Sequence, residues 1–153
     1  MQEDSVFKRE YVLMDADVST KEECLAFIAG KAVGFGISSS VQGTIDGFLE
    51  REKVDSTGFS DGFAIPHTRC DAVLKPSVMV VKTRRGIDWP SMDGEPTVVV
   101  FALLVPKQVG STVHLKLLSA LSRKLVNAEF QKSLLNSCDP DEIFGIINQA
   151  IQS

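Results

Sequence analysis

The longest apolar run in this chain of 153 residues is Thr97-Val-Val-Val-Phe-Ala-Leu-Leu-Val105. A continuous apolar run of this length predicts a strand that is buried on both faces. It is far shorter than the roughly 20 apolar residues that a membrane-spanning helix needs. A second run of the same kind is Ser77-Val-Met-Val-Val-Lys82. Together the two runs predict a sheet whose faces are both covered by other elements.

Shorter candidate elements surround these two runs. Further strands are expected at Tyr11–Met14, Phe63–Ile65 and Gly86–Pro90. Helices are expected from the capping box Ser19-Thr-Lys-Glu22 to about Gly34, and then over residues 39–53, 111–125, 128–135 and from Pro140 onward. In the long helix over 111–125 the leucines at 115, 118, 121 and 125 are expected to face the core. The predicted fold class is α/β (α+β), with a central mixed β-sheet flanked by helices on both sides in a single domain over residues 1–153.

Composition and charge exclude several classes of function. The formal net charge is −4, and the nearest approach to a basic cluster is Lys82, Arg84 and Arg85, interpreted as the solvated end of a strand. A nucleic-acid-binding face is therefore not expected. The polar, acidic N-terminal segment does not resemble a signal peptide, and the three cysteines lack metal-ligand spacing. We expect a cytoplasmic protein without direct membrane insertion, metal or cofactor.

The two histidines lie where a side chain is available for chemistry. His67 follows Pro66 at a predicted strand end, and His114 lies in the first turn of the long predicted helix. Taken alone, His67 is explained as an ordinary loop residue, and His114 as a helix-start residue with local hydrogen bonds. Their surroundings, Asp61-Gly-Phe-Ala-Ile-Pro-His67 and His114-Leu-Lys-Leu-Leu118, give them a different meaning.

Four motifs occur together in this chain: Arg51-Glu52, Ser56-Thr-Gly58, Gly62-Phe-Ala-Ile-Pro-His67 and His114-Leu115. In order and spacing they resemble the signature of enzyme IIA domains of the fructose/mannitol-type phosphoenolpyruvate-dependent sugar phosphotransferase system. The resemblance covers essentially the whole chain. It implies a mixed sheet flanked by helices and a phosphotransferase activity with a phosphohistidine intermediate.

The same resemblance implies roles for individual residues and partners. His67 matches the phosphorylated histidine, His114 the second active-site histidine and Arg51 the active-site arginine. Phosphate would arrive from the histidine-containing phosphocarrier protein and leave to a cysteine of a IIB domain or subunit, coupled to a IIC membrane permease. Regulatory, nitrogen-type paralogues share the Pro-His motif, so a regulatory function stays open beside sugar uptake and phosphorylation. The sugar cannot be read from this chain, because the membrane component recognises it.

The residue types suit phosphoryl transfer. A neutral imidazole is a good nucleophile, and its ordinary pKa near 6.5 leaves it mostly unprotonated at neutral pH. Arg51 would neutralise charge on the transferring group, and His114 at a helix start would donate to a phosphoryl oxygen. The Ser56–Gly58 turn is expected to add further donors. Arg51 can meet His67 only if the loop over 54–61 returns the chain toward the end of the helix.

Three further readings concern the neighbourhood of His67. Asp61 is a candidate for orienting a histidine proton, and equally a plain turn residue. Cys70 and His67 would form the nucleophile pair of a hydrolase, but no third group is seen to orient them. His67, His114 and Asp61 match no metal-ligand spacing, so a metal site is not expected.

Overall fold

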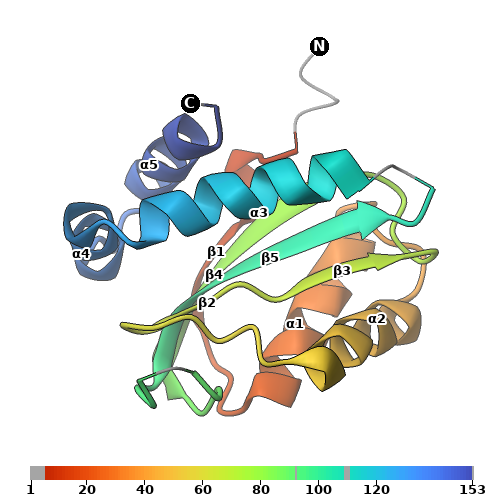
Figure 1. Cartoon of the computed structure of the whole chain (residues 1–153), viewed down its shortest axis with the longest axis horizontal. Helices are drawn as coiled ribbons and strands as arrows, with labels where there is room; N and C mark the ends of the chain where they lie inside the picture. Colours follow the sequence, from red (N-terminus) through yellow and green to blue (C-terminus); the bar gives the residue numbers. More distant parts are fainter. Residues whose placement is uncertain (1–5, 92, 109–110, 153) are drawn as a thin grey trace.

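A mixed five-stranded sheet forms the centre of the fold within the residues that the computed structural model describes, which are 6–91, 93–108 and 111–152 (Figure 1). Its strands are β1 (Val12–Ala16), β2 (Phe63–Ala64), β3 (His67–Cys70), β4 (Ser77–Ile87) and β5 (Thr97–Pro106). β1 pairs with β4 in parallel, and β4 pairs with β5 in antiparallel fashion. The short strands β2 and β3 both pair in parallel with the other edge of β5. Nearly every residue of β5 is buried, as its apolar run predicts.

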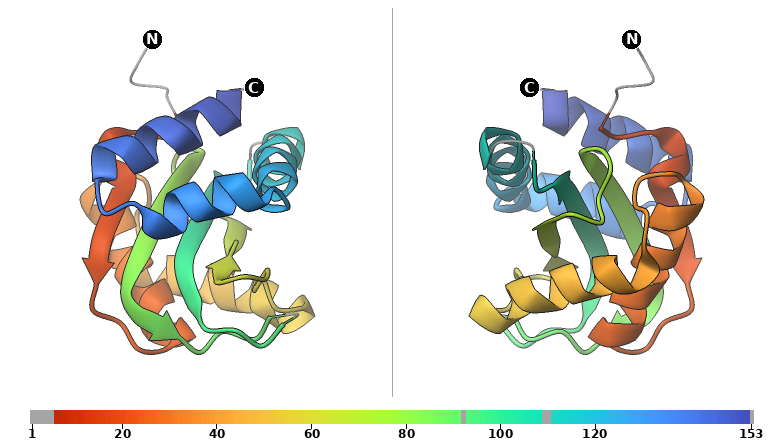
Figure 2. Two further views of the ribbon diagram at one scale, coloured as in Figure 1. Left: turned by 90° about the vertical axis from the view of Figure 1, so that its left-hand side faces the viewer. Right: turned by 90° about the vertical axis from the view of Figure 1, so that its right-hand side faces the viewer.

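Helices cover both faces of this sheet (Figures 1 and 2). They are α1 (Lys21–Gly34), α2 (Val41–Val54), α3 (Ser111–Leu125), α4 (Ala128–Asn136) and α5 (Pro140–Gln152), and a short 3₁₀ turn, η2 (Arg9–Tyr11), precedes β1. The pair α1 and α2 packs on one face, and α3, α4 and α5 pack on the other. The predicted fold class is confirmed. None of the described helices is long and apolar enough to cross a bilayer.

The first helix begins one residue later than the predicted capping box. Thr20, not Ser19, is the N-cap, and its side chain accepts a hydrogen bond of 3.1 Å from the Glu23 amide. Glu23 in turn accepts 2.7 Å from the Ser19 amide. The prediction was ambiguous because residues 19 and 20 both carry hydroxyls and residues 22 and 23 are both glutamates. Only the backbone geometry selects between two overlapping capping patterns.

One strand prediction was incomplete and another was wrong. The short strand β2 ends before Pro66, as expected, but the chain resumes pairing at His67, which lies opposite Leu103 in β5. Proline lacks only the N–H group, and the Pro66 carbonyl still accepts 3.0 Å from the Leu103 amide, so the register continues across it. The separate strand expected at Gly86–Pro90 is instead the far end of β4, which reaches Ile87 after a register shift.

The buried stripe of α3 also differs from its prediction. The buried leucines are Leu117, Leu121 and Leu125, at intervals of four residues. Leu115 was expected in the core but is 59% exposed. A run with leucines at 115, 117 and 118 fits two helical faces equally well, and packing against the sheet decides between them.

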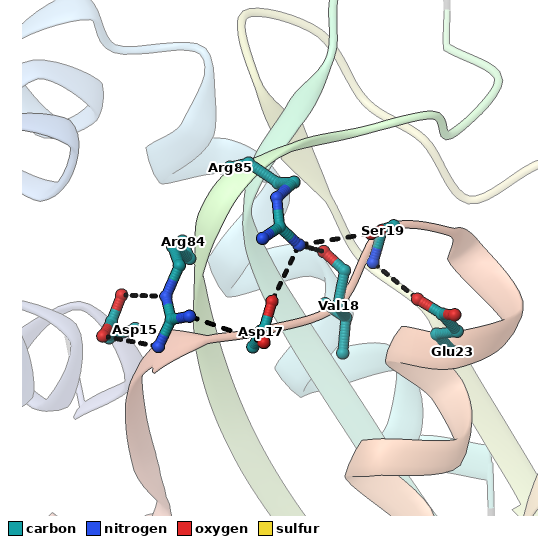
Figure 3. A network of polar contacts seen from close by, with 7 residues as sticks. All are labelled: Asp15, Asp17, Val18, Ser19, Glu23, Arg84 and Arg85. Carbon is teal, nitrogen blue, oxygen red and sulfur yellow. Dashed lines mark hydrogen bonds and ion pairs between the residues drawn. The ribbon is translucent and has the colours of Figure 1, made fainter.

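The predicted basic cluster divides into two environments. Lys82 is half-buried, and its ammonium donates to the carbonyls of Leu134, Leu135 and Ser137, which caps the end of α4. Arg84 and Arg85 are exposed and pair with the carboxylates of Asp15 and Asp17 (Figure 3).

A close helix–strand approach positions the functional site. A Cβ atom at Gly47 would lie 2.4 Å from the hydroxyl oxygen of Thr68 and 3.0 Å from the sulfur of Cys70. Only glycine therefore lets α2 lie this near to β3. Arg51 lies one helical turn beyond Gly47 on the same face, so the approach brings it toward His67 at the start of β3.

Candidate active site

His67 has a partner at each ring nitrogen. Nδ1 lies 2.9 Å from the carbonyl oxygen of Ile65, and Nε2 lies 2.9 Å from Nε of Arg51. A guanidinium N–H can only donate, so Nε2 must accept with its lone pair. The neutral ring then carries its proton on Nδ1 and donates it to Ile65. This tautomer leaves the lone pair of the ring on Nε2, within a residue that is only 7% exposed.

Arg51 spans the space between the end of α2 and His67. While Nε donates to the ring, Nη1 donates 2.8 Å to the carbonyl of Asp55. The loop after α2 does return as required, because the Ile65 amide donates 2.9 Å to the Thr57 carbonyl. Among the described residues no carboxylate forms an ion pair with Arg51, so its charge is not neutralised by a neighbouring acid. Two residues selected from the sequence thus meet across 16 positions of chain.

The Ser56–Gly58 turn uses its hydroxyls within the fold. Ser56 donates to the Pro90 carbonyl, and Thr57 donates to the carboxylate of Glu52. A Cβ atom at Gly58 would lie 2.0 Å from the Pro90 oxygen, so glycine is required where these two loops touch. This turn was expected to add backbone or hydroxyl donors toward a phosphoryl group; in the structure both hydroxyls bond within the fold and hold the loop in place.

Asp61 lies in a tight turn with a left-handed backbone, at φ 57°. Its carboxylate accepts from the hydroxyl of Ser60 and from the side-chain amide of Gln131 in α4, each at 3.2 Å. Its own amide donates 2.8 Å to Asp93. The N–H groups of Asp61 and Glu95 hold the pKa of the Asp93 carboxyl below its usual value. These contacts connect Asp61 to α4 and to the loop before β5.

The remaining candidate is His114, in the first turn of α3. Its side chain lies outside the described residues, so its distance from His67 stays a prediction.

The geometry around Cys70 does not support a thiol–histidine pair. Side chains alternate along a strand, so Cys70 shares a face with Thr68 and not with His67. The sulfur lies against α2, 4.0 Å from the Gly43 carbonyl. Within the described part of the chain, no group of three His, Cys, Asp or Glu side chains is arranged to hold a metal ion.

The sequence also matches a known protein family over nearly its whole length. Residues 5–150 match the family described as "Phosphoenolpyruvate-dependent sugar phosphotransferase system, EIIA 2". The chain belongs to this family. One relative, the "PTS system fructose-specific EIIA component" of Haloferax volcanii, is 33% identical over 143 residues, which are 94% of this chain and 92% of the relative. Some curated relatives are far longer: the match spans 16% of the PTS system fructose-specific EIIABC component of Bacillus subtilis and 16% of the multiphosphoryl transfer protein of Shigella flexneri.

Solved structures share the EIIA fold. The nitrogen regulatory protein IIA-Ntr from Neisseria meningitidis is 26% identical with a TM-score of 0.86, covering 95% of this chain and 99% of that chain. The enzyme IIAMTL of Escherichia coli, solved in complex with phosphorylated enzyme IIBMTL, is 20% identical with a TM-score of 0.78, covering 94% of this chain and 99% of that chain. The chain is therefore an EIIA phosphotransfer domain whose relatives include both sugar-system and regulatory proteins.

Proposed function

We propose that this EIIA domain is a phosphoryl carrier that becomes phosphorylated on Nε2 of His67. The observation that carries the proposal is the pair of contacts on the ring: Ile65 holds the proton on Nδ1, and Arg51 reaches Nε2. One contact sets the tautomer, and the other places a permanent positive charge beside the nitrogen that would attack.

The proposed transfer exchanges one N–P bond for another. The Nε2 lone pair of His67 attacks the phosphorus of a phosphohistidine on the donor, a new N–P bond forms, and the donor nitrogen keeps the electrons of the bond that breaks. Because Arg51 now donates to that lone pair, it must release Nε2 before attack. Its guanidinium then lies close to the incoming phosphoryl oxygens, where one charge pair at about 4 Å is worth roughly 4 kcal/mol.

The proposed donor is the histidine-containing phosphocarrier protein, and the proposed acceptor is a cysteine of a IIB domain or subunit that serves a IIC permease for sugar uptake. The complex of IIAMTL with phosphorylated IIBMTL supports the acceptor, since that protein shares this fold. These partners act in the cytoplasm, where we place the domain. We propose His114 as a donor to a phosphoryl oxygen, and for Asp61 we favour the turn role because Ser60 and Gln131 engage its carboxylate.

The decisive experiment is phosphorylation by the general phosphotransferase proteins, followed by mapping of the modified residue. His67→Gln is expected to abolish phosphate uptake, because His67 is the one histidine in the motif Ala64-Ile-Pro-His67. The circular dichroism spectrum should remain that of the folded protein. Undiminished labelling of this variant, with the label on His114, would contradict the assignment.

A regulatory function is the second candidate. It is favoured by the structural likeness to IIA-Ntr, which has 26% identity and a TM-score of 0.86. The two candidates share the first transfer and differ in the second. Rapid transfer from phosphorylated His67 to a IIB cysteine supports sugar uptake; a stable phosphohistidine whose presence changes binding to another protein supports regulation.

A further inference from the structure

Glu52 lies next to Arg51 in α2 and is held by an unusually complete set of contacts. Its carboxylate accepts 3.3 Å from the Thr57 amide and also accepts from the Thr57 hydroxyl. The ammonium of Lys21 in α1 lies 3.6 Å from the same carboxylate. The Glu52 side chain is only 5% exposed. A carboxylate this buried is costly unless it is paired and hydrogen-bonded, so these contacts hold both Glu52 and Thr57 in one position.

Thr57 passes this restraint to His67. The Thr57 carbonyl accepts 2.9 Å from the Ile65 amide, and the Ile65 carbonyl lies 2.9 Å from Nδ1 of His67. On the other side of the ring, Nε2 accepts from Arg51, whose backbone is joined directly to that of Glu52. The contacts form a closed path, the Glu52–His67 circuit, which runs through Thr57, Ile65, His67 and Arg51.

Among the described residues of the Glu52–His67 circuit, only Glu52 accepts a hydrogen bond from the Thr57 side chain. Without the carboxylate, the Thr57 amide and hydroxyl lose their acceptor, and the contact between Asp55 and Arg51 remains as the hydrogen bond that ties this loop to α2. The Ile65 carbonyl then loses the restraint from Thr57, while its neighbours Ala64 and Pro66 stay bonded to β5. The Nδ1–H tautomer is then fixed mainly by the N–H that Arg51 donates to Nε2. Once Arg51 releases Nε2 for attack, an imidazole with a poorly held acceptor at Nδ1 populates both tautomers, and in one of them Nε2 carries the proton and cannot attack.

We propose that Glu52 is a positioning residue, which fixes the tautomer and orientation of His67 through Thr57 and Ile65. The proposal rests on the phosphoryl-carrier function inferred above, and it adds a residue that touches neither the imidazole nor the phosphoryl group. Because the role is one of position, it can be measured in the tautomer of the His67 imidazole without any phosphoryl transfer.

The test compares four variants of the full chain. Glu52→Ala removes all acceptors, whereas Glu52→Gln keeps an acceptor for the Thr57 amide and a hydrogen-bonding partner for its hydroxyl while losing the charge. Thr57→Val removes the hydroxyl alone and serves as a second variant should Glu52→Ala fail to fold. The matched control is Glu50→Ala, since Glu50 lies in the same helix with a side chain that is 74% exposed. The readouts are the ¹⁵N chemical shifts of the His67 ring, which report the tautomer, and the rate of phosphorylation by the phosphocarrier protein.

The expected result is a graded one. Glu52→Ala should shift both ring nitrogens toward the average of the two tautomers and slow phosphorylation about tenfold, in keeping with the cost of small misplacements of reacting groups. Thr57→Val should move both readouts in the same direction but less. Glu52→Gln should stay within about threefold of the wild-type rate, because it keeps a partner for both Thr57 groups and loses only the ion pair with Lys21, which is not part of the path from Thr57 to His67. Glu50→Ala should change neither readout.

Either of two results would overturn the proposal: wild-type ring shifts in both Glu52→Ala and Thr57→Val, or a slowed Glu52→Ala whose ring shifts are unchanged. Failure of the proposed function looks different. In that case the wild-type domain accepts no phosphate, while the ring shifts of the variants still report whether Glu52 positions His67.

Discussion

Two arginine sites on this domain use the same side chain for opposite purposes. At the end of β4, Arg84 and Arg85 pair with the carboxylates of Asp15 and Asp17 on an exposed surface (Figure 3). At the end of α2, Arg51 is partly buried and donates to a neutral ring nitrogen and to a backbone carbonyl. The first site spends its positive charge on acids that are always present. The second places two of its N–H groups on neutral acceptors and, under the proposed function, keeps its charge for a phosphoryl anion.

The difference shows how a cation is kept available beside a nucleophile. A carboxylate next to Arg51 would compete with a phosphoryl group for the guanidinium. A neutral acceptor orients the guanidinium with little such competition, because it leaves most of the guanidinium's positive charge unneutralised. In the neighbouring residue the carboxylate of Glu52 is turned to Thr57 and Lys21 instead. Arg51 thus differs from Arg84 and Arg85 in having no acidic partner among the described residues and in donating to a histidine ring.

The largest expected effect comes from replacing Arg51, compared with the same replacement of Arg84. Arg51→Gln is expected to slow phosphorylation of His67 by about two to three orders of magnitude, the loss of a few kcal/mol of charge stabilisation. Arg51→Lys keeps the charge but loses the planar fork, so we expect a smaller loss of about tenfold. Rates of phosphate uptake from the phosphocarrier protein measure both.

Arg84→Gln is the matched control, since it removes an arginine that is already paired. Its phosphorylation rate should equal that of the wild type. Equal rates for Arg51→Gln and Arg84→Gln would erase the distinction between the two sites.

A smaller effect is expected from moving Arg51 without changing its charge. Gly47→Ala places a Cβ atom against Thr68 and Cys70 and should push α2 away from β3. We expect a loss of about 1–3 kcal/mol in the free energy of unfolding, the usual cost of overpacking. Phosphorylation should slow as well, because Arg51 and His67 are held on the two elements that separate.

Gly30→Ala in α1 is the control for this substitution. A Cβ atom there meets nothing within 4 Å, so alanine should stabilise the helix by about 0.5–1 kcal/mol. Urea unfolding measures both variants. A Gly47→Ala protein as stable as Gly30→Ala would mean that the close approach is not required.

The smallest effect concerns the exposed arginine site and is visible only through pH. The hydrogen bond from Arg84, together with its charge, holds the pKa of Asp15 below the ordinary value. A depressed folded-state pKa contributes stability above the unfolded pKa of about 3.9, and this is lost as pH falls through the folded-state pKa. Asp15→Asn should therefore be slightly less stable than the wild type at pH 7, with a difference that shrinks below about pH 4. Asparagine tolerates the left-handed backbone at this position, where φ is 54°.

Urea midpoints at pH 7 and pH 3 test this prediction. A pH-independent difference would assign the effect of Asp15→Asn to the backbone and not to the ion pair.

Several features of this protein were readable from local sequence. The run over Thr97–Val105 predicts a buried strand because every residue in it after Thr97 is apolar, and β5 matches it closely. Pro140 predicts the start of α5 because proline suits the first turn of a helix, where no N–H partner is needed. The four motifs identify the family and select His67 and Arg51. In each case the signal resides in neighbours along the chain.

Other features were decided by packing. The leucine face of α3, the contacts of Lys82 with the end of α4 and the resumption of pairing after Pro66 each depend on elements that are distant in sequence. The same is true of the site, because Arg51 reaches His67 only where Gly47 lets α2 lie against β3, and β3 exists only through its pairing with β5. The motif letters specify which side chains are available for chemistry. Which nitrogen of His67 carries the proton, and which arginine keeps its charge free, follows from hydrogen bonds between segments that meet only after folding.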